Sequence, residues 1–559
     1  MTEKSEITTV IERFYHWENT TPDSVFLRQP HDGKWTDITF GETGQIARKM
    51  TAALQNMGLE KGDHIGIYSK NCYHWILADI AIMMGGYVSV PFYSSLPGDQ
   101  LAEVVRLSDV KAVFLGKLDY WTQGHVEALS DVKCIKTPHY ASTAQVTLGT
   151  DWDSLISEFE PIADGHRPHP DDLWSIKFTS GTTGTPKGVM HSQRSFANGA
   201  ILNEQHNWID HSRKHPRFLS YLPLNHVGER IGIELPAIWR GGTISFNESV
   251  ETFARDIQET QPHIFFGVPR IWTHMYQGVI AKIPEEQLDQ LLANPATAEP
   301  TKTQIRTSLG FRDLEVAATG AAITPAFIKE FYQKLVIHLI EAYGMTELGG
   351  ALINTPDASY PLDCVGKCAP WGDVRVDPDT NEIQFKSEIM MLGYYNAPEH
   401  TAAVLSEDGW LNSGDRGEID EDGFVRVIGR VKDAFKTSKG SYITPNPLEE
   451  VLAQNEYVEQ VCVAGLGIPQ PIALVNLTPT AQQADKKSVE ASLIKAVEVL
   501  NKTRANFERI STVIVQSETW SNDNGFLTPT LKIKRFTFDK TFGDSYRDWH
   551  NSPEKVIWT

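Results

Sequence analysis

The sequence predicts an α/β fold with largely parallel sheets, followed by a small antiparallel β subdomain and an α+β unit. Short apolar runs alternate with amphipathic helical stretches from about residue 60 to about residue 350, which is typical of α/β proteins. Near residue 365 the pattern changes to alternating strands joined by turn residues. The chain has 559 residues, and at roughly 100–200 residues per domain this predicts three or four domains or subdomains.

The first region contains a series of expected strands and two expected helices. Apolar runs predict strands at residues 64–68, 87–92, 111–115, 174–178, 263–268 and 314–318. Helical patterns predict helices at 75–84 and 325–335, with Pro325 in the first turn, where a missing amide is tolerated. Asp79 and the pair Gly85-Gly86 interrupt the apolar stretch 75–92, so we expect a buried βαβ piece there rather than a membrane span.

The second region combines hairpin signals with a further α+β pattern. Segment 377–381, rich in Asp, Pro and Asn, separates two alternating runs, and the turn pair Asp422-Gly423 precedes a third. The expected strands are 374–376, 382–386 and 424–427, then 461–464 and 473–477, with a helix near 488–503. We therefore place the β subdomain at about 365–430 and a domain boundary at 429–432.

Composition excludes several classes of protein. Apolar residues make up 41% and charged residues 22% of the chain, which is ordinary for a globular protein and excludes a mainly disordered one. The formal charge of −20 repels phosphate backbones, so a nucleic-acid partner is not expected.

Cysteines and the N-terminus bear on the expected compartment. The five cysteines are scattered and odd in number, which argues against a disulfide framework. Cys364 and Cys368 lack a second Cys or His pair nearby, so free thiols are favoured over a metal site. The first ten residues contain no apolar run behind Lys4, so no signal peptide is expected and the cytoplasm is the simplest compartment.

A loop rich in Ser, Thr and Gly follows the expected strand 174–178. It runs from Thr179 through Ser180, Gly181, Thr182, Thr183 and Gly184 to Lys187. Glycines let backbone amides approach an anion, hydroxyls add donors, and the lysine supplies a positive charge. The loop is therefore expected to bind phosphate, although Gly188 after the lysine excludes a Walker loop. By composition alone, a flexible turn is equally acceptable.

Six segments in order resemble the motifs of the adenylate-forming superfamily, which includes acyl-CoA synthetases, peptide-synthetase adenylation domains and beetle luciferases. They are residues 178–188, 319–322, 341–347, 412–415, 429–433 and 527–535. The resemblance spans nearly the whole chain. It implies a large N-terminal domain (1–430) of two stacked α/β subdomains plus a small β-barrel subdomain, then a small mobile α+β C-terminal domain (431–559). It also implies an active site between the two domains, with ATP on the large one.

The resemblance assigns nucleotide contacts. Tyr343 would stack on adenine, because its ring offers a flat face, and Gly320 would let the base approach backbone. Asp415 would accept the ribose hydroxyls and Arg430 would donate to ribose or phosphate. Without the motifs, Tyr343 would be expected in the core and the other two in ion pairs. The implied nucleotide-binding set is Thr179, Ser180, Gly181, Thr182, Thr183, Gly184, Gly320, Ala321, Ala322, Tyr343, Gly344, Asp415 and Arg430.

The resemblance also implies the catalytic residues Lys532, Thr346, Glu347, Lys187 and His226. Thr346 would donate to the α-phosphate, and Glu347 would hold Mg²⁺ through oxygen. Lys532 would bridge the attacking carboxylate and the α-phosphate, with Lys534 as the alternative register. From composition alone, we would instead expect Lys532 and Lys534 to lie on the solvent-exposed edge of a strand.

A hinge and a face for the second substrate are implied as well. Lys432 occupies the hinge position, where a few backbone dihedrals could swing the C-terminal domain. Lys436 and Gly440 would lie on the face that meets CoA.

Three segments resemble long-chain acyl-CoA synthetases: 221–230, 261–272 and 527–532. His226, in the first of them, would line the acyl or thiol passage, and the alternative is a structural histidine. Trp239 is a candidate for the tunnel wall, but core packing is favoured.

The implied reaction activates a medium- or long-chain fatty acid with Mg·ATP to an acyl-adenylate, releases pyrophosphate, and then transfers the acyl group to CoA with loss of AMP. The expected partners are the fatty acid, ATP and CoA. Three alternatives stay open: transfer to a carrier-protein thiol, a luciferase-like oxygenase, and a non-catalytic nucleotide sensor. A peripheral membrane contact and a homodimer also stay open.

Overall fold

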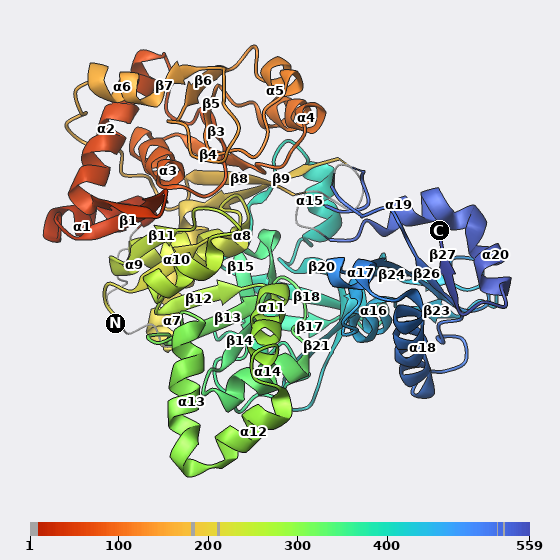
Figure 1. Cartoon of the computed structure of the whole chain (residues 1–559). Helices are drawn as coiled ribbons and strands as arrows, with labels where there is room; N and C mark the ends of the chain where they lie inside the picture. The colour runs from red at the N-terminus through yellow and green to blue at the C-terminus, as the bar shows by residue number, and fades with distance from the viewer. Residues whose placement is uncertain (1–8, 180–184, 210–212, 523, 529–531) are drawn as a thin grey trace. The chain divides into compact units, whose positions relative to one another are not determined.

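The computed structural model describes residues 9–179, 185–209, 213–522, 524–528 and 532–559. The chain forms two compact units (Figure 1). The first unit comprises Met1–Asp373 and Phe385–Leu411, and the second comprises Val374–Gln384 and Asn412–Thr559. The domain boundary expected at 429–432 stays a prediction.

The first unit contains two large sheets, each mainly parallel with antiparallel strands at an edge. The nine-stranded sheet has the order β16 (Lys367–Cys368), β15 (Gly350–Asn354), β14 (Leu339–Met345), β13 (Val316–Gly320), β12 (Ile264–Gly267), β10 (Arg217–Ser220), β11 (Thr243–Phe246), β1 (Val25–His31) and β2 (Lys34–Thr39). The eight-stranded sheet has the order β19 (Gly393–Tyr394), β9 (Lys187–Ser192), β8 (Leu173–Thr179), β4 (Val88–Phe92), β3 (His64–Tyr68), β5 (Ala112–Leu115), β6 (Lys133–Lys136) and β7 (Thr150–Asp151).

Helices cover these sheets. In Figure 1, α4 and α5 lie on one side of the eight-stranded sheet, and α2, α3 and α6 lie on the other. The helices of this unit are α1 (Val10–Thr20), α2 (Phe40–Asn56), α3 (Tyr73–Gly85), α4 (Gly98–Ser108), α5 (Gln123–Ala128), α6 (Trp152–Glu158), α7 (Gln193–His206), α8 (Val227–Glu229), the π-helix η1 (Arg230–Glu234), α9 (Leu235–Arg240), α10 (Phe253–Thr260), α11 (Pro269–Ile280), α12 (Glu285–Ala293), α13 (Pro295–Ser308), α14 (Ala326–Lys334), the 3₁₀-helix η2 (Thr346–Leu348) and α15 (Pro398–Val404).

Burial follows the two-residue period of the strands. In β5, Ala112 and Phe114 pack in the same cluster as α2 and α3, whereas Val113 and Leu115 pack in the cluster that contains α4. Both faces of the sheet are therefore covered, which is why its central parallel strands β3, β4 and β5 are mainly apolar. The cluster beside α3 also includes Phe218 of β10, so the two sheets share one hydrophobic core.

Helix α3 is buried on all sides. Every residue from His74 to Gly85 is buried, and β3 and β4, which flank the helix in sequence, pair in parallel. The prediction of a buried βαβ piece in this stretch is confirmed. In the part of the chain that the structure describes, no helix has both the length and the apolar character needed to cross a bilayer.

A buried ion cluster joins three elements of this unit. Arg230 of η1 has no exposed surface, and its Nη2 lies 2.5 Å from Asp79 Oδ2 of α3. Its Nε lies 2.7 Å from Glu234 Oε2, and its Nη1 donates to Ser175 Oγ of β8 at 3.4 Å. The Arg230 Cζ also lies 4.2 Å from the ring centroid of Trp174. One guanidinium thus ties α3 and η1 to the strand that enters the Ser/Thr/Gly-rich loop.

A four-stranded sheet, most of whose residues belong to the second unit, has the order β17 (Gly372–Val376), β18 (Glu382–Ser387), β20 (Leu411–Ile419) and β21 (Val425–Arg430). A second sheet has the order β24 (Val458–Ala464), β25 (Ile472–Leu477), β26 (Val513–Val515) and β27 (Val556–Trp558), and β22 (Phe435–Lys436) pairs with β23 (Tyr442–Ile443). The helices are α16 (Asn446–Leu452), α17 (Pro479–Gln483), α18 (Lys486–Lys502), α19 (Arg535–Phe542), the 3₁₀-helix η3 (Gly543–Ser545) and α20 (Tyr546–Asn551). One face of the second sheet packs on α18 and the other on α19.

The α/β prediction is confirmed, and each predicted strand and helix has a counterpart, with two corrections. Pro325 does not lie in the first turn of α14: it precedes the helix as its N-cap residue with an extended ψ of 138°. Strand β13 does not end at residue 318 but continues to Gly320, because Gly320 pairs with Ala342 of β14.

Candidate active site

The predicted adenine turn lies at the carboxyl end of β13. Gly320 pairs with Ala342, and a Cβ added to Gly320 would lie 2.6 Å from the Ala342 carbonyl oxygen, so only glycine fits. Ala321 follows with a left-handed φ of 68°, a conformation that turns the chain sharply away from the strand. The turn continues through Ala322, which is exposed.

Tyr343 lies on β14, the neighbouring parallel strand. Its side chain is half-buried, and its ring centroid lies 5.8 Å from that of Phe385. Gly344 follows, where any Cβ would clash with the carbonyl oxygen of Gly350. The fold therefore places Tyr343 and the turn at Gly320 on adjacent strands, at the same edge of the sheet.

Glu347 and Lys187 are linked through a tyrosine. Glu347 lies on η2 directly after β14, and its Oε1 accepts a hydrogen bond of 2.7 Å from the Tyr394 hydroxyl. Tyr394 lies on β19, which pairs with β9 at Val189. The ammonium of Lys187, the first residue of β9, lies 5.3 Å from the Tyr394 ring centroid. Burial and the nearby Glu347 carboxylate raise the pKa of Tyr394 far above its ordinary value, so its hydroxyl stays a donor.

Tyr394 is a site residue that the sequence analysis missed. Strand β19 contains only Gly393 and Tyr394, and a two-residue strand has no periodicity to detect. The signal that could have identified it is the aromatic pair Tyr394-Tyr395 after a glycine, which marks a backbone position needing unusual dihedrals. Gly393 does have a positive φ of 138°.

The remaining predicted residues of this edge are partly described. Thr346 precedes Glu347 on η2, and its carbonyl accepts from the Gly349 amide at 2.9 Å. Thr179 is the last residue of β8 and pairs with Lys187. Ser180, Gly181, Thr182, Thr183 and Gly184 lie outside the described residues.

His226 lies at the start of α8 and is half-buried. Its Nδ1 accepts a hydrogen bond of 3.0 Å from the Gly228 amide, which leaves Nε2 as the protonated nitrogen of the neutral ring. The histidine therefore caps this helix, which is the structural role named above as the alternative. Trp239 is 4% exposed and packs in the main core, so the favoured prediction of core packing is confirmed.

Glu229, three residues after His226, is fully buried and accepts hydrogen bonds from Ser220 Oγ at 2.8 Å and from the Tyr221 amide at 3.0 Å. Burial raises the pKa of Glu229 to about 8, although these hydrogen bonds oppose the rise. An unfolded glutamate titrates near pH 4.3, so between about pH 5 and pH 8 the folded chain holds a proton that the unfolded chain has released. This contribution to stability is complete below about pH 4 and is lost as pH rises through about 8.

Glu229→Gln removes this titration but keeps the carbonyl acceptor. We expect the free energy of unfolding to fall with pH more steeply in the wild type than in the variant between pH 5 and pH 8, by up to about 1.4 kcal/mol per pH unit. Urea unfolding of both proteins at each pH measures the difference. Parallel slopes would show that Glu229 does not titrate in this range.

In the second unit, Asp415 and Arg430 face each other. They are paired residues on β20 and β21, and Arg430 Nε lies 2.9 Å from Asp415 Oδ1. The Asp415 amide also donates to Ser413 Oγ at 3.0 Å. The structure thus brings together two residues that the family motifs assign to ribose and phosphate. The ion pair between them is also what we expected for these residues without the motifs.

The hinge and CoA-side residues follow along the chain. Lys432 lies two residues beyond the end of β21. Lys436, on β22, places its ammonium 5.6 Å from the Tyr442 ring centroid. Gly440 has a φ of 88° in a turn closed by its amide, which donates to the Thr437 carbonyl at 3.0 Å.

Lys532 is exposed and anchored by its backbone. Its amide donates to Thr528 Oγ1 at 3.0 Å, and its carbonyl accepts from the Thr528 amide at 2.8 Å. Lys534 is half-buried, and loss of solvation lowers its pKa. The exposed lysine therefore suits a role toward an outside ligand better than Lys534 does.

Two family models match this chain. The model of the AMP-binding enzyme matches residues 14–395, and the model of the AMP-binding enzyme C-terminal domain matches residues 432–545. The chain belongs to the AMP-binding enzyme family.

Relatives of this AMP-binding enzyme match along nearly its full length. It is 26% identical to a long-chain-fatty-acid–CoA ligase of Mycobacterium bovis, covering 96% of both chains. It is 27% identical to long chain acyl-CoA synthetase 1 of Arabidopsis thaliana, covering 95% of this chain and 91% of the relative. Among solved structures, it resembles the adenylation domain of a carboxylate reductase from Mycobacterium chelonae, with a TM-score of 0.81, 22% identity, and 98% and 92% of the two chains covered. The adenylate-forming fold is thereby confirmed.

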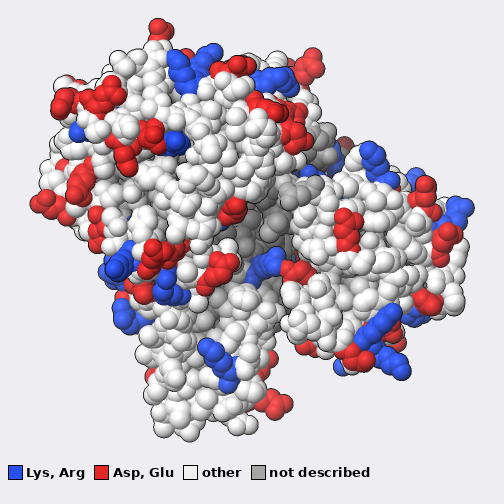
Figure 2. Space-filling model, turned by 45° about the horizontal axis from the view of Figure 1, so that its top comes forward, with Lys and Arg blue, Asp and Glu red and all other residues white. Residues whose placement is uncertain are grey.

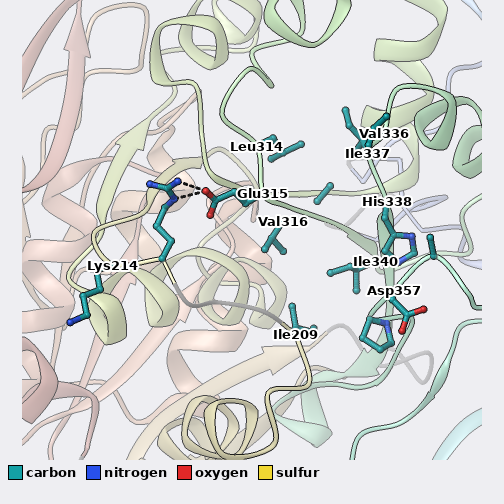
Figure 3. Close-up of a pocket in the computed structure, with 14 residues that line it drawn as sticks. Ile209, Lys214, Leu314, Glu315, Val316, Val336, Ile337, His338, Ile340 and Asp357 are labelled. Carbon is teal, nitrogen blue, oxygen red and sulfur yellow. Dashed lines mark hydrogen bonds and ion pairs between the residues drawn. The ribbon is translucent and has the colours of Figure 1, made fainter. Parts of the chain in front are cut away.

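A separate cavity of about 760 Å³ lies at the opposite, amino ends of β13 and β14 in this AMP-binding enzyme (Figure 3). Val316 and His338 line it, and Arg213 Nε donates to Glu315 Oε1 at 2.6 Å on its wall. None of the residues implied by the family motifs lines this cavity. It is therefore distinct from the edge that carries Gly320 and Tyr343.

Charged side chains of both signs occur on the surface of this AMP-binding enzyme. Figure 2 shows acidic side chains interspersed with basic ones on the face in view. Among the described residues of that face, positive charge is not gathered into one broad patch.

Proposed function

We propose that this AMP-binding enzyme is an AMP-forming ligase that joins medium- or long-chain fatty acids to CoA. The observation that carries the proposal is the full-length similarity to long-chain-fatty-acid–CoA ligases. The contacts that link Lys187 through Tyr394 to Glu347 support it, because they bring together a cation that suits phosphate and a carboxylate that suits Mg²⁺.

In the first step, a carboxylate oxygen of the fatty acid attacks the α-phosphorus of ATP in line. A bond forms between that oxygen and the α-phosphorus, the bond to the bridging oxygen breaks, and pyrophosphate leaves with its electron pair. Tyr343 and the turn at Gly320 hold the adenine, and Lys187 and Thr346 donate to phosphate oxygens. Lys532 bridges the two anions, stabilising the charge of the transition state.

Glu347 fits a magnesium site. It is a half-buried carboxylate with one oxygen oriented by Tyr394, and Mg²⁺ bound to nucleotides usually takes one or two protein carboxylates. Mg²⁺ held there would neutralise the phosphate charge that repels the incoming carboxylate.

In the second step, the CoA thiolate attacks the acyl carbonyl, and AMP leaves as the carbonyl reforms. We propose that Asp415 and Arg430 hold the ribose, that Lys432 is the hinge between domains 1–430 and 431–559, and that Lys436 and Gly440 serve the CoA side. His226 would line the passage toward the reacting carbonyl. Neither step forms a covalent bond to the enzyme.

The test is pyrophosphate release with ATP, Mg²⁺ and saturated acids from acetate to longer chains, with and without CoA. Turnover that requires CoA and peaks at a medium or long chain would support the ligase. Release that ignores CoA would indicate transfer to a carrier-protein thiol. A chain that binds ATP but releases no pyrophosphate with any acid would contradict the proposal and favour a nucleotide sensor.

The proposed metal site predicts the effect of Tyr394→Phe. Losing the hydroxyl frees the Glu347 carboxylate to rotate, so we expect the half-saturating Mg²⁺ concentration to rise about 10-fold, with kcat at saturating Mg²⁺ little changed. Tyr395→Phe is the matched control, because that hydroxyl donates to Asp109 instead, at 2.9 Å. If the half-saturating Mg²⁺ concentration is the same in the wild type and both variants, Tyr394 does not orient the Glu347 carboxylate for Mg²⁺.

A further inference from the structure

The first residue of α19, Arg535, is a buried arginine that the proposed reaction leaves unused. Its side chain is 9% exposed. Nη2 lies 2.8 Å from Glu449 Oε1 on α16, and Nη1 donates to the Val463 carbonyl of β24 at 2.5 Å and to Cys462 Sγ at 3.3 Å. The guanidinium is thus held by a charged partner, a backbone carbonyl and a sulfur, on two elements of the second unit.

The partner Glu449 is itself fixed. Its Oε1 accepts a hydrogen bond of 2.7 Å from the Val463 amide, while its Oε2 accepts from Arg535 Nη2 at 3.0 Å. Carboxylate and guanidinium therefore both contact the backbone of the same β24 residue. Such geometry leaves Arg535 little freedom to move within this unit.

Lys532 lies three residues before this fixed point. Three extended residues span at most about 11 Å, so the position of Arg535 limits where the lysine can reach. The backbone between them is held as well: the Lys534 amide donates to the Phe526 carbonyl at 2.9 Å, and Leu527 bridges to Ile533. The segment that carries Lys532 is thereby anchored at its carboxyl end.

Arg535 also faces the hinge. Asp433, the residue after Lys432, places Oδ2 4.0 Å from Arg535 Nε. This distance is too long for a hydrogen bond, and Asp433 is 26% exposed, so the contact is the loosest that Arg535 makes. A rotation of backbone dihedrals at Lys432 would change it while leaving the pair with Glu449 in place.

We infer that Arg535 is a positioning residue for the adenylation step. Its ion pair with Glu449 fixes the position of Lys532. Its contact with Asp433 makes that position depend on the conformation of the hinge at Lys432. The inference rests on the proposed function, since it assumes that Lys532 acts in adenylation. A purely structural ion pair would instead affect both half-reactions alike.

The test compares the two half-reactions in Arg535→Lys, with Arg509→Lys, an exposed arginine of the same unit, as the matched control. Adenylation is measured as ATP–pyrophosphate exchange with a fatty acid, and thioester formation is measured from supplied acyl-adenylate and CoA. Lysine keeps the charge but cannot contact Glu449 and the Val463 carbonyl in the same geometry. We expect kcat for adenylation to fall about 100-fold with the KM for ATP nearly unchanged, because a displacement of about 1 Å has that effect.

Thioester formation should change less than about threefold in Arg535→Lys, and Arg509→Lys should match the wild type in both assays. Equal losses in both half-reactions, or an unchanged rate of adenylation, would overturn the inference. Absence of exchange in the wild type would instead contradict the proposed function.

Asp433→Asn keeps the test decisive if Arg535→Lys does not fold, because Asp433 is partly exposed and its Oδ2 lies 4.0 Å from Arg535 Nε, beyond hydrogen-bond distance. We expect it to lower adenylation about fivefold and to spare thioester formation. Where the double variant folds, the two effects should combine to less than their product, since both act through one contact. If the ratio of the adenylation rate to the thioester-formation rate is the same in Asp433→Asn as in the wild type, Arg535 is not coupled to the hinge.

Discussion

Lys532→Ala is expected to lower the rate of adenylation by about 10³-fold, because the variant loses the charge proposed to bridge two anions in the transition state. Lys532 is exposed, and its backbone bonds to Thr528 do not depend on its side chain, so its truncation should leave the fold intact. Thioester formation from supplied acyl-adenylate should stay within about threefold of the wild type. Single-turnover assays of each half-reaction measure both rates.

Two further lysine variants make this result specific. Lys540→Ala removes an exposed lysine of α19 and should leave both rates unchanged. Lys534→Ala tests the alternative register: if it, and not Lys532→Ala, abolishes adenylation, the catalytic assignment moves by two residues. Equal losses in both half-reactions for Lys532→Ala would contradict the role of that lysine.

Arg230→Ala is expected to lower the free energy of unfolding of the first unit by about 3–5 kcal/mol, because it leaves two buried carboxylates without their cation. Asp79 and Glu234 lie 2.5 and 2.7 Å from the guanidinium and are both buried. Urea unfolding monitored by tryptophan fluorescence suits the measurement, since the ring centroid of Trp174 lies 4.2 Å from the Arg230 Cζ.

The matched control is Arg213→Ala, which breaks a surface ion pair with Glu315 in the same unit. A pair that is 44% and 41% exposed contributes about 0–1 kcal/mol. The triple variant Asp79→Leu, Arg230→Met, Glu234→Leu should recover most of the stability, because apolar side chains need no buried counter-charge. If Arg230→Ala costs no more than Arg213→Ala, the buried cluster does not stabilise the fold as described.

Much of the fold followed from local pattern. Strand β3 spans His64–Tyr68 as expected, and α3 extends the expected helix by two residues at one end and one at the other. These elements are buried on several sides, so their sequences are mostly apolar and easily detected. The errors lie at ends: Pro325 caps its helix instead of entering it, and β13 is lengthened by pairing with β14. Element ends depend on neighbours that local sequence does not specify.

The sequence by itself determined the family motifs. Those motifs single out Lys187, Glu347, Asp415 and Arg430 as candidate site residues. Their chemistry depends on short segments, in which glycines and charged residues occur at fixed spacing along the chain. Such signals are local, so they need no knowledge of the fold.

Only the tertiary structure decided which of these groups meet. The hydrogen bond from Tyr394 to Glu347 joins residues 47 positions apart, the pair of Arg230 with Asp79 spans 151 positions, and that of Arg535 with Glu449 spans 86. The sequence motifs assign no role to Tyr394 or Arg535, because each makes its contacts with a residue on another element. The spacing of apolar residues in one segment indicates which of its faces are buried. Which other element packs against those faces depends on how the sheets and helices are arranged.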